Sequence, residues 1–271
     1  GLETGDMAKG EALFWAGGCG SCHAEKGAKG DDKKRLGGGH KLDTPAGIFV
    51  TPNISPDLET GIGSWSAEQF ANAMLNGVSQ NGSHYYPSFP YTSYARMTSQ
   101  DVGHLWAYMK TLPAVSRANE DHDLPLLFSV RRGLGLWKLL FLSDQPMISD
   151  LPDDGQIARG QYLVEGAGHC GDCHTPRTFF GFGSPDGSNW LAGGPAPEGE
   201  GKIPNITAHE NALGGWSAGD IAYYLETGFT PDFDSVGGTM VSVQENMAKL
   251  TKADREAIAA YLKSIPKVSA D

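Results

Sequence analysis

The motif Cys-x-x-Cys-His occurs twice in this chain of 271 residues and uses all four of its cysteines. The two copies are formed by Cys19, Cys22 and His23, and by Cys170, Cys173 and His174. A Cys-x-x-Cys pair alone is compatible with half a zinc site, a redox dithiol or a disulfide. A histidine directly after the second cysteine, in both copies, is far more specific, because this arrangement is the attachment motif of c-type haem.

Covalent haem attachment explains both cysteines and the histidine of each motif. The two thiols add across the vinyl groups of the haem, and the imidazole of the next residue binds the iron as its proximal ligand. A single zinc site would require the two pairs to converge across 151 residues of chain, and it would leave both histidines unexplained. The sequence therefore predicts two covalently bound haem c groups, with His23 and His174 as the proximal iron ligands.

The segments around the motif also recur in the same order. Residues 52–55 (PNIS) match residues 204–207 (PNIT), and residues 98–113 match residues 251–266 without a gap. Self-similarity of this kind is the mark of a repeated structural unit. We expect a duplicated module of roughly 110 residues, with one haem motif in each copy.

Helical patterns dominate each copy. The last matching segment begins at Thr98 or Thr251, whose hydroxyl can cap a helix, and ends at Pro113 or Pro266, which stops one. Apolar residues recur at helical spacing between these limits. No alternating run of apolar and polar residues is long enough to indicate a real sheet. The predicted fold class is all-α.

The repeat divides the chain into two domains and a connecting segment. We expect a first domain over residues 1–115, a linker over 116–152 and a second domain over 153–271. The linker contains an apolar stretch, residues 124–144, that also holds three basic residues. These charges and the internal position argue against a membrane span. We expect a linker helix that packs back over a domain, and a docking surface for a partner is the alternative.

Charge and composition narrow the function classes further. The formal net charge is −11, which argues against nucleic-acid binding because that needs clustered Lys and Arg. The sequence has no apolar span of twenty residues and no signal peptide. We expect a periplasmic protein whose leader was removed on export, with no membrane span in this chain.

The chain resembles the cytochrome c subunits of membrane-bound alcohol, gluconate and related sugar dehydrogenases, and the free-standing diheme cytochromes of the same group. The segments that carry the resemblance are residues 51–55 (TPNIS), 84–91 (HYYPSFPY), 170–177 (CGDCHTPR) and 237–240 (GGTM). The dehydrogenase subunits usually carry three haem motifs and a C-terminal anchor, whereas this chain has two motifs and ends at a predicted helix. The resemblance implies tandem class I cytochrome c domains, bacterial export and electron transfer.

In domains of this family, the distal iron ligand normally comes from the loop before the last helix. In the second copy Met240 lies in that loop, eleven residues before Thr251, and it matches the family's methionine after Gly-Gly. Met247 is the alternative, but it lies only four residues before Thr251 and is expected to pack in the core. Thioether ligation favours reduced iron and raises its potential relative to a second imidazole.

The first copy departs from the family pattern. Phe89 stands where the family's Tyr-Pro-x-Met-Pro-Tyr segment has its methionine, and a phenyl ring cannot bind iron. His84, fourteen residues before Thr98, and Met97, directly before it, are the two main alternatives. Met74 in a predicted helix is a third, and an open or water-bound iron is the last.

These features together predict an electron carrier, not an enzyme. The sequence contains no recognisable nucleophile–base pair, nicotinamide or flavin motif, or separate metal site. We expect electrons to come from a periplasmic dehydrogenase and to pass to an oxidase or a small cytochrome. The alternative is a diheme enzyme that resembles a peroxidase or a thiosulfate dehydrogenase, in which an open or labile first haem binds substrate.

Overall fold

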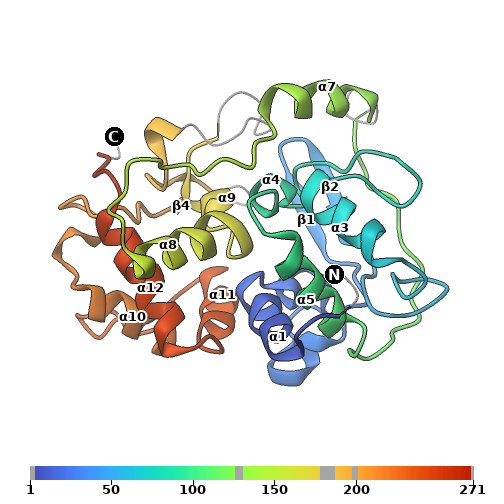
Figure 1. Cartoon of the computed structure of the whole chain (residues 1–271), viewed down its shortest axis with the longest axis horizontal. Coiled ribbons are helices and arrows are strands. Elements are labelled where there is room, and N and C mark those ends of the chain that lie inside the picture. The colour runs from blue at the N-terminus through green and yellow to red at the C-terminus, as the bar shows by residue number, and fades with distance from the viewer. Residues whose placement is uncertain (1–3, 126–130, 178–186, 197–200, 270–271) are drawn as a thin grey trace. The chain divides into compact units, whose positions relative to one another are not determined.

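The structure divides into two compact units, Gly1–Leu142 (unit 1) and Ser143–Asp271 (unit 2), and each holds one copy of the Cys-x-x-Cys-His motif. It is a computed structural model, and the residues that it describes are 4–125, 131–177, 187–196 and 201–269. Helices dominate both units and strands are few (Figure 1). The prediction of a helix-rich fold is confirmed.

Unit 1 is built around the first and last helices of its repeat. Its elements are α1 (Met7–Ala16), α2 (Cys19–His23), β1 (Lys41–Thr44), β2 (Gly47–Val50), α3 (Ala67–Asn76), α4 (Tyr91–Tyr94), α5 (Ser99–Met109) and α7 (Arg132–Phe141). Helix α1 packs along α5, and Gly10 permits this because a side chain there would collide with the carbonyl oxygen of His104. Phe70 of α3 stacks on Trp106 of α5, with ring centroids 4.8 Å apart.

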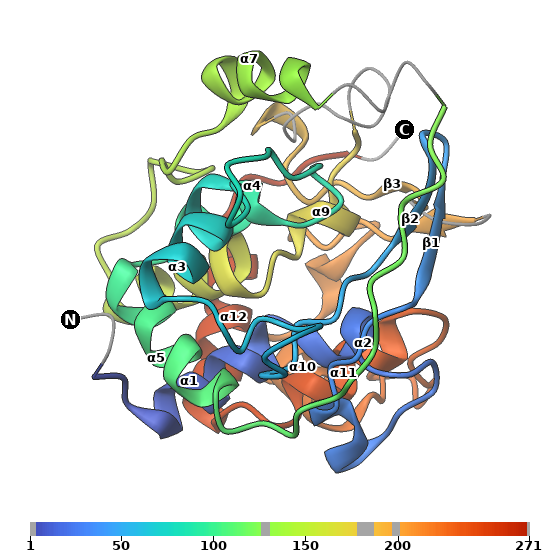
Figure 2. The same cartoon turned by 90° about the vertical axis from the view of Figure 1, so that its right-hand side faces the viewer.

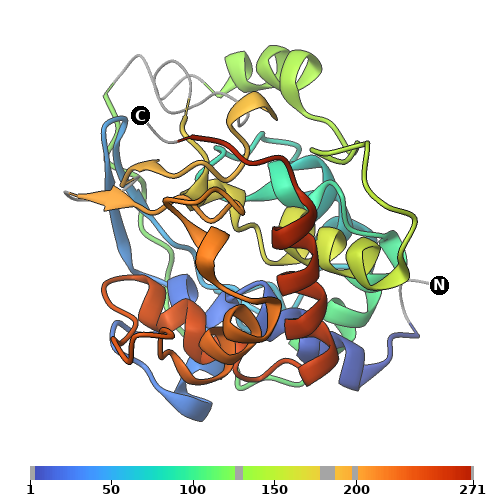
Figure 3. The same ribbon diagram turned by 90° about the vertical axis from the view of Figure 1, so that its left-hand side faces the viewer.

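Unit 2 repeats this arrangement. Its elements are α8 (Gly155–Tyr162), a π-helical turn (Leu163–Ala167), α9 (Gly171–His174), β3 (Gly194–Pro195), β4 (Lys202–Ile203), α10 (Ala218–Thr227), α11 (Met240–Met247) and α12 (Lys252–Ser264). Helix α8 packs along α12, drawn in red in Figure 3. Gly160 permits this close packing as Gly10 does in unit 1, because a side chain there would collide with the carbonyl oxygen of Ala257. Helix α10 packs on both α11 and α12.

The predicted helix starts are confirmed by the hydrogen bonds at their ends. The hydroxyl of Thr98 accepts from the backbone N–H of Asp101 at 3.1 Å, and the hydroxyl of Thr251 accepts from that of Asp254 at 3.1 Å. Each bond satisfies a donor that the first helical turn leaves free. The Thr-x-x-Asp pattern therefore marks the start of the last helix in both units.

Two short antiparallel hairpins were not predicted. In unit 1, β1 pairs with β2 so that Lys41 lies opposite Val50, and Figure 2 shows the two strands side by side. In unit 2, β3 pairs with β4 over two residues on each strand. Strands this short do not produce a recognisable alternation in the sequence. They add short strands to a fold that is otherwise helix-rich, as predicted.

Helix α7 lies inside the apolar stretch at 124–144, as the expected linker helix does, and it belongs to unit 1. Residues 126–130 of that stretch lie outside the described residues. The domain limits predicted at residues 115 and 152 remain predictions. In the part of the chain that the structure describes, no helix is both long enough and apolar enough to cross a membrane.

Candidate haem-binding sites

Each Cys-x-x-Cys-His motif forms a short helical turn. Cys19, Cys22 and His23 lie on α2, and Cys173 and His174 lie on α9, with Cys170 directly before it. Residues three and four apart share one face of a helix. Both thiols and the imidazole therefore face the same side, as attachment to a single planar group requires.

The two candidate proximal histidines are held in the same way. Nδ1 of His23 lies 2.8 Å from the carbonyl oxygen of Pro52, and Nδ1 of His174 lies 2.8 Å from that of Pro204. A carbonyl oxygen can only accept, so each Nδ1 donates its proton and each Nε2 keeps its lone pair. Burial lowers the pKa of both histidines below the usual value. Neutral imidazoles with a free Nε2 fit a haem iron.

The repeated Pro-Asn segments are explained by these contacts. The proline carbonyl orients the histidine. The asparagine that follows the proline forms a hydrogen bond with the segment after the last helix. The side-chain amide of Asn53 donates to the carbonyl oxygen of Val115 at 2.7 Å, and that of Asn205 donates to Val268 at 2.7 Å. The Pro-Asn segment therefore connects the proximal histidine with the end of each repeat.

The four cysteines form no disulfide in the structure. Burial raises the pKa of Cys19 and of Cys170 to about 12, because an ionised thiolate loses its hydration there. Both sulfurs are therefore protonated at neutral pH before haem is attached.

Two buried polar atoms in unit 1 were missed by the sequence analysis. Nδ1 of His40 and the hydroxyl of Tyr91 are buried without a hydrogen-bond partner in the described residues. An unpaired buried polar atom is costly, so such atoms usually have a partner. His40 is also close enough to His23 to affect its charge. A carboxylate-bearing group such as haem offers acceptors of the kind that both atoms lack.

The structure places His84 against α7. Its Nδ1 lies 3.1 Å from the ammonium nitrogen of Lys138, which also donates to the carbonyl oxygens of Asn76 and Gly77 at the end of α3. Lys138 is 8% exposed and lies over the ring of Tyr91, 4.6 Å from its centroid. Burial lowers the pKa of Lys138 to about 8. This lysine joins α7 to α3 and to the candidate ligand His84.

The other candidate distal residues differ in burial. Met97 is 6% exposed and directly precedes α5, and Met74 of α3 is also buried. Phe89, at the family's methionine position, packs in an aromatic cluster with its nearest ring centroid, that of Tyr85, at 5.5 Å. In unit 2, Met240 is the half-buried first residue of α11. Its competitor Met247 is 4% exposed, as expected for a packing residue.

A buried polar network supports the haem turn of unit 2. Trp190 Nε1 donates to the hydroxyl of Tyr261 at 2.9 Å, and that hydroxyl donates to a carboxylate oxygen of Glu165 at 2.6 Å. The ring of Trp190 lies against Gly171, where any side chain would collide with it. The network therefore links α9 to α12 through the π-helical turn. The sequence analysis did not identify any of its members.

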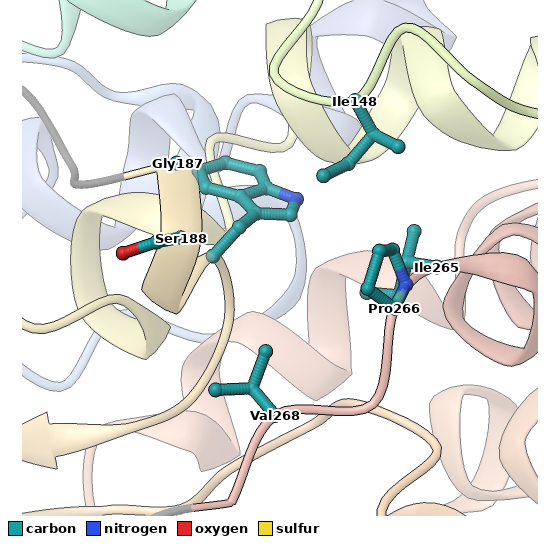
Figure 4. Close-up of a pocket in the computed structure, with 7 residues that line it drawn as sticks. Ile148, Gly187, Ser188, Ile265, Pro266 and Val268 are labelled. Atoms are coloured by element: carbon teal, nitrogen blue, oxygen red, sulfur yellow. The ribbon is translucent and has the colours of Figure 1, made fainter.

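Trp190 also lines a small apolar pocket (Figure 4). The other lining residues are Ile148, Gly187, Ser188, Ile265, Pro266 and Val268. None of these residues carries an ionisable side chain. The pocket therefore offers no group for acid–base chemistry, and we interpret it as a packing defect next to the buried network.

Comparisons with known proteins agree with this geometry. The family model for cytochrome c matches residues 7–113. The chain is 53% identical to the "Diheme cytochrome c-type" protein of Cereibacter sphaeroides, over 98% of this chain and 88% of that protein. It is 37% identical to the gluconate 2-dehydrogenase cytochrome c subunit of Pantoea cypripedii and 36% identical to the fructose dehydrogenase cytochrome subunit of Gluconobacter japonicus.

The coverage of these relatives differs. The chain spans 59% of the Pantoea subunit and 52% of the Gluconobacter subunit. The match to the diheme protein extends over nearly all of both chains and includes both Cys-x-x-Cys-His motifs. The chain therefore belongs to the cytochrome c family, as a diheme member with two covalently bound haem c groups.

Proposed function

We propose that this chain is a periplasmic electron-transfer protein made of two tandem class I cytochrome c domains joined by a packed linker, with one haem c in each unit. The observation that carries the proposal is the contact that both histidines share. In each, Nδ1 lies 2.8 Å from the carbonyl oxygen of a proline. When bound, haem c supplies a reversible one-electron couple of its iron. The chain needs to attach, orient and shield this group.

In unit 1, Cys19 and Cys22 form the thioether bonds and Nε2 of His23 binds the iron. In unit 2, Cys170, Cys173 and His174 do the same. Met240 is the proposed distal ligand of the second haem, since it lies between α10 and α12, as the first residue of α11. The proline carbonyls fix the ring orientation and increase the basicity of each imidazole.

For the first haem, the contacts of His84 favour Met97 as the distal ligand. An ammonium group can only donate, so Nδ1 of His84 accepts from Lys138 and the proton of the neutral ring lies on Nε2. Nε2 faces Gly135 of α7, where an added side-chain carbon would lie 2.8 Å from it. Neither nitrogen of His84 then offers a lone pair to iron, whereas a thioether such as that of buried Met97 keeps its lone pairs at any pH.

The proposed partners follow from the names of the relatives. Several similar proteins are cytochrome subunits of gluconate, fructose and alcohol dehydrogenases. We therefore propose a periplasmic dehydrogenase as the electron donor, and an oxidase or a small cytochrome as the acceptor. The alternative of a diheme peroxidase or thiosulfate dehydrogenase gains no support from the names of these relatives.

The holoprotein provides a direct test. Its mass should equal that of the polypeptide plus two haems, and a potentiometric titration should show two one-electron steps. Both irons should be six-coordinate and low-spin at rest by magnetic circular dichroism. A single haem, a zinc ion, or a high-spin resting iron that binds cyanide tightly would contradict the proposal, and the last result would support the diheme enzyme.

A further inference from the structure

The same hydrogen-bonded turn follows the middle helix in both units. In unit 1, residues 78–84 form it after α3, and in unit 2 residues 229–235 form it after α10, drawn in orange in Figure 1. A β-bridge closes each turn at its base, between Val78 and His84 and between Phe229 and Ser235. The two turns are equivalent parts of the repeat.

The internal bonds of the two turns also correspond. In unit 1 the N–H of Ser79 donates to the carbonyl oxygen of Ser83 at 2.9 Å, and in unit 2 the N–H of Thr230 donates to that of Asp234 at 2.9 Å. The hydroxyl of Thr230 also accepts from the N–H of Asp234 at 3.0 Å. The turn in unit 2, which we call the Phe233 turn (residues 229–235), is therefore well fixed.

The residue at the tip of the turn differs between the units. Both tips have left-handed backbone, with φ of 82° at Gly82 and 61° at Phe233. Glycine adopts this conformation freely, but a residue with a side chain is strained in it. Phe233 is also 90% exposed, and Phe229 at the base of the turn is 47% exposed. Left-handed backbone at a phenylalanine and an exposed aromatic ring both reduce the stability of the fold. Their presence together therefore indicates that Phe233 has a role in binding.

Charge restricts what can bind there. Asp232 and Asp234 flank Phe233 and are exposed. Unit 2 contains 18 of the 32 acidic residues of the chain but only 8 of its 21 Lys and Arg residues, so nearly all of the net charge of −11 lies in this unit. A second copy of unit 2 and an anionic lipid surface would both be repelled. A partner with Lys and Arg side chains around an apolar patch would be attracted.

We propose that the Phe233 turn is the docking site on unit 2 for a basic redox protein. The inference rests on the proposed electron-transfer function and adds the surface and the partner's chemistry to it. Phe233 serves as the apolar anchor, and its flanking aspartates steer and orient the partner. The turn lies in the same loop as Met240, seven residues before it, so docking there places the partner at the loop of the proposed distal ligand. Each encounter moves one electron, which oxidises one haem protein and reduces the other, with no proton transferred.

The test uses holoprotein and two redox probes. The docking probe is mitochondrial cytochrome c, a small haem protein with a lysine-rich surface, and the non-docking probe is hexaammineruthenium. The variants are Phe233→Gly, which installs the residue of the equivalent turn, and the double change of Asp232 and Asp234 to Asn. Leu139→Gln is the matched control, because Leu139 is 81% exposed in unit 1. Stopped-flow measurements give the second-order rate constant of electron exchange over a range of ionic strength.

Phe233→Gly should lower the rate constant with cytochrome c about fivefold or more at every ionic strength, as loss of a hot-spot residue does. The double Asn variant should lower it severalfold at low salt only and reduce its salt dependence. Phe233→Gly should react with hexaammineruthenium at the wild-type rate, within about twofold. The double Asn variant should do so at high ionic strength, where the lost charges are screened for this cationic probe as well. Leu139→Gln should match the wild type with both probes.

Several results would overturn the inference. One is a Phe233→Gly protein that reacts with cytochrome c as fast as the wild type. Another is a changed haem spectrum or potential in that variant, since Phe233 would then cover the haem. A concentration-dependent dimer that is lost in Phe233→Gly would assign the turn to self-association. Wild-type protein that reacts with hexaammineruthenium but not with cytochrome c would refute the docking site alone, whereas failure with both probes would refute the proposed function.

Discussion

Replacement of Tyr261 by Phe should destabilise unit 2 much more than the equivalent change, Tyr108→Phe, destabilises unit 1. The two tyrosines occupy matching positions in the last helices of the repeat. The hydroxyl of Tyr261 joins Trp190 to the buried carboxylate of Glu165, at 2.9 and 2.6 Å. The hydroxyl of Tyr108 donates to Glu11, at 3.1 Å.

The magnitude follows from what each change leaves behind. Loss of the Tyr261 hydroxyl removes a bond to a buried carboxylate, worth about 1.5–3 kcal/mol, and leaves the buried Trp190 N–H without its acceptor, at about 1–3 kcal/mol. Partial relaxation reduces the sum, and we expect a loss of about 3 kcal/mol. The side chain of Glu11 is 45% exposed, so water can replace the bond of Tyr108, and we expect a loss of about 1 kcal/mol or less.

Hydrogen exchange measured by mass spectrometry can assign each effect to its own unit. The free energy of opening should fall for peptides from α8 and α12 in Tyr261→Phe, and for peptides from α1 and α5 in Tyr108→Phe. A difference of about 2 kcal/mol between the variants corresponds to about a thirtyfold difference in the opening constant. Equal losses, within about 0.5 kcal/mol, would show that the buried network does not hold α12 to the haem turn.

Three further predictions concern the proposed ligands and one buried phenol. Met240→Ala and Met97→Leu should each remove about half of the near-infrared sulfur-to-iron band and lower the potential of one haem; a spectrum unchanged by Met97→Leu would rule that ligand out. Lys138→Met should release the imidazole of His84, and a bis-imidazole signal in the magnetic circular dichroism spectrum of the first haem would detect its binding to iron. Burial and the bond to Glu11 raise the pKa of Tyr108 to about 12 from a usual value near 10. The unfolded chain therefore loses this proton first, and the free energy of unfolding should fall as pH rises from about 10 to 12. The urea midpoint of Tyr108→Phe should fall less than that of the wild type over the same interval.

Local features of the fold were predictable because they depend on short stretches of sequence. The caps at Thr98 and Thr251 need only a hydroxyl and a backbone N–H three residues away, and both formed as expected. The haem motifs place their three functional residues within one helical turn for the same reason. The two hairpins were missed because four-residue and two-residue strands carry too little pattern.

The long-range contacts of the candidate sites were not predictable. Lys138 is a clear case, because a lysine in an apolar stretch normally keeps its ammonium in water. Here the ammonium is buried against a helix end 61 residues earlier in the chain. Glu165 and Tyr261 are separated by 96 residues, and neither has a neighbour in the sequence that indicates the other. Such pairs depend on how the helices pack, which one sequence does not reveal.

The matched histidine–proline contacts have a consequence for the direction of electron flow. A hydrogen bond from the far nitrogen of an iron-bound imidazole tunes how strongly that ligand donates to the metal. Since both contacts measure 2.8 Å, they would act alike on the two proposed proximal ligands once haem is bound. A difference between the two reduction potentials would then come from the opposite haem faces and their exposure to solvent. Substitutions near Met97 and Met240 should therefore change the difference between the two reduction potentials. They would set the direction of electron flow between the two haems while both proximal ligands stay unchanged.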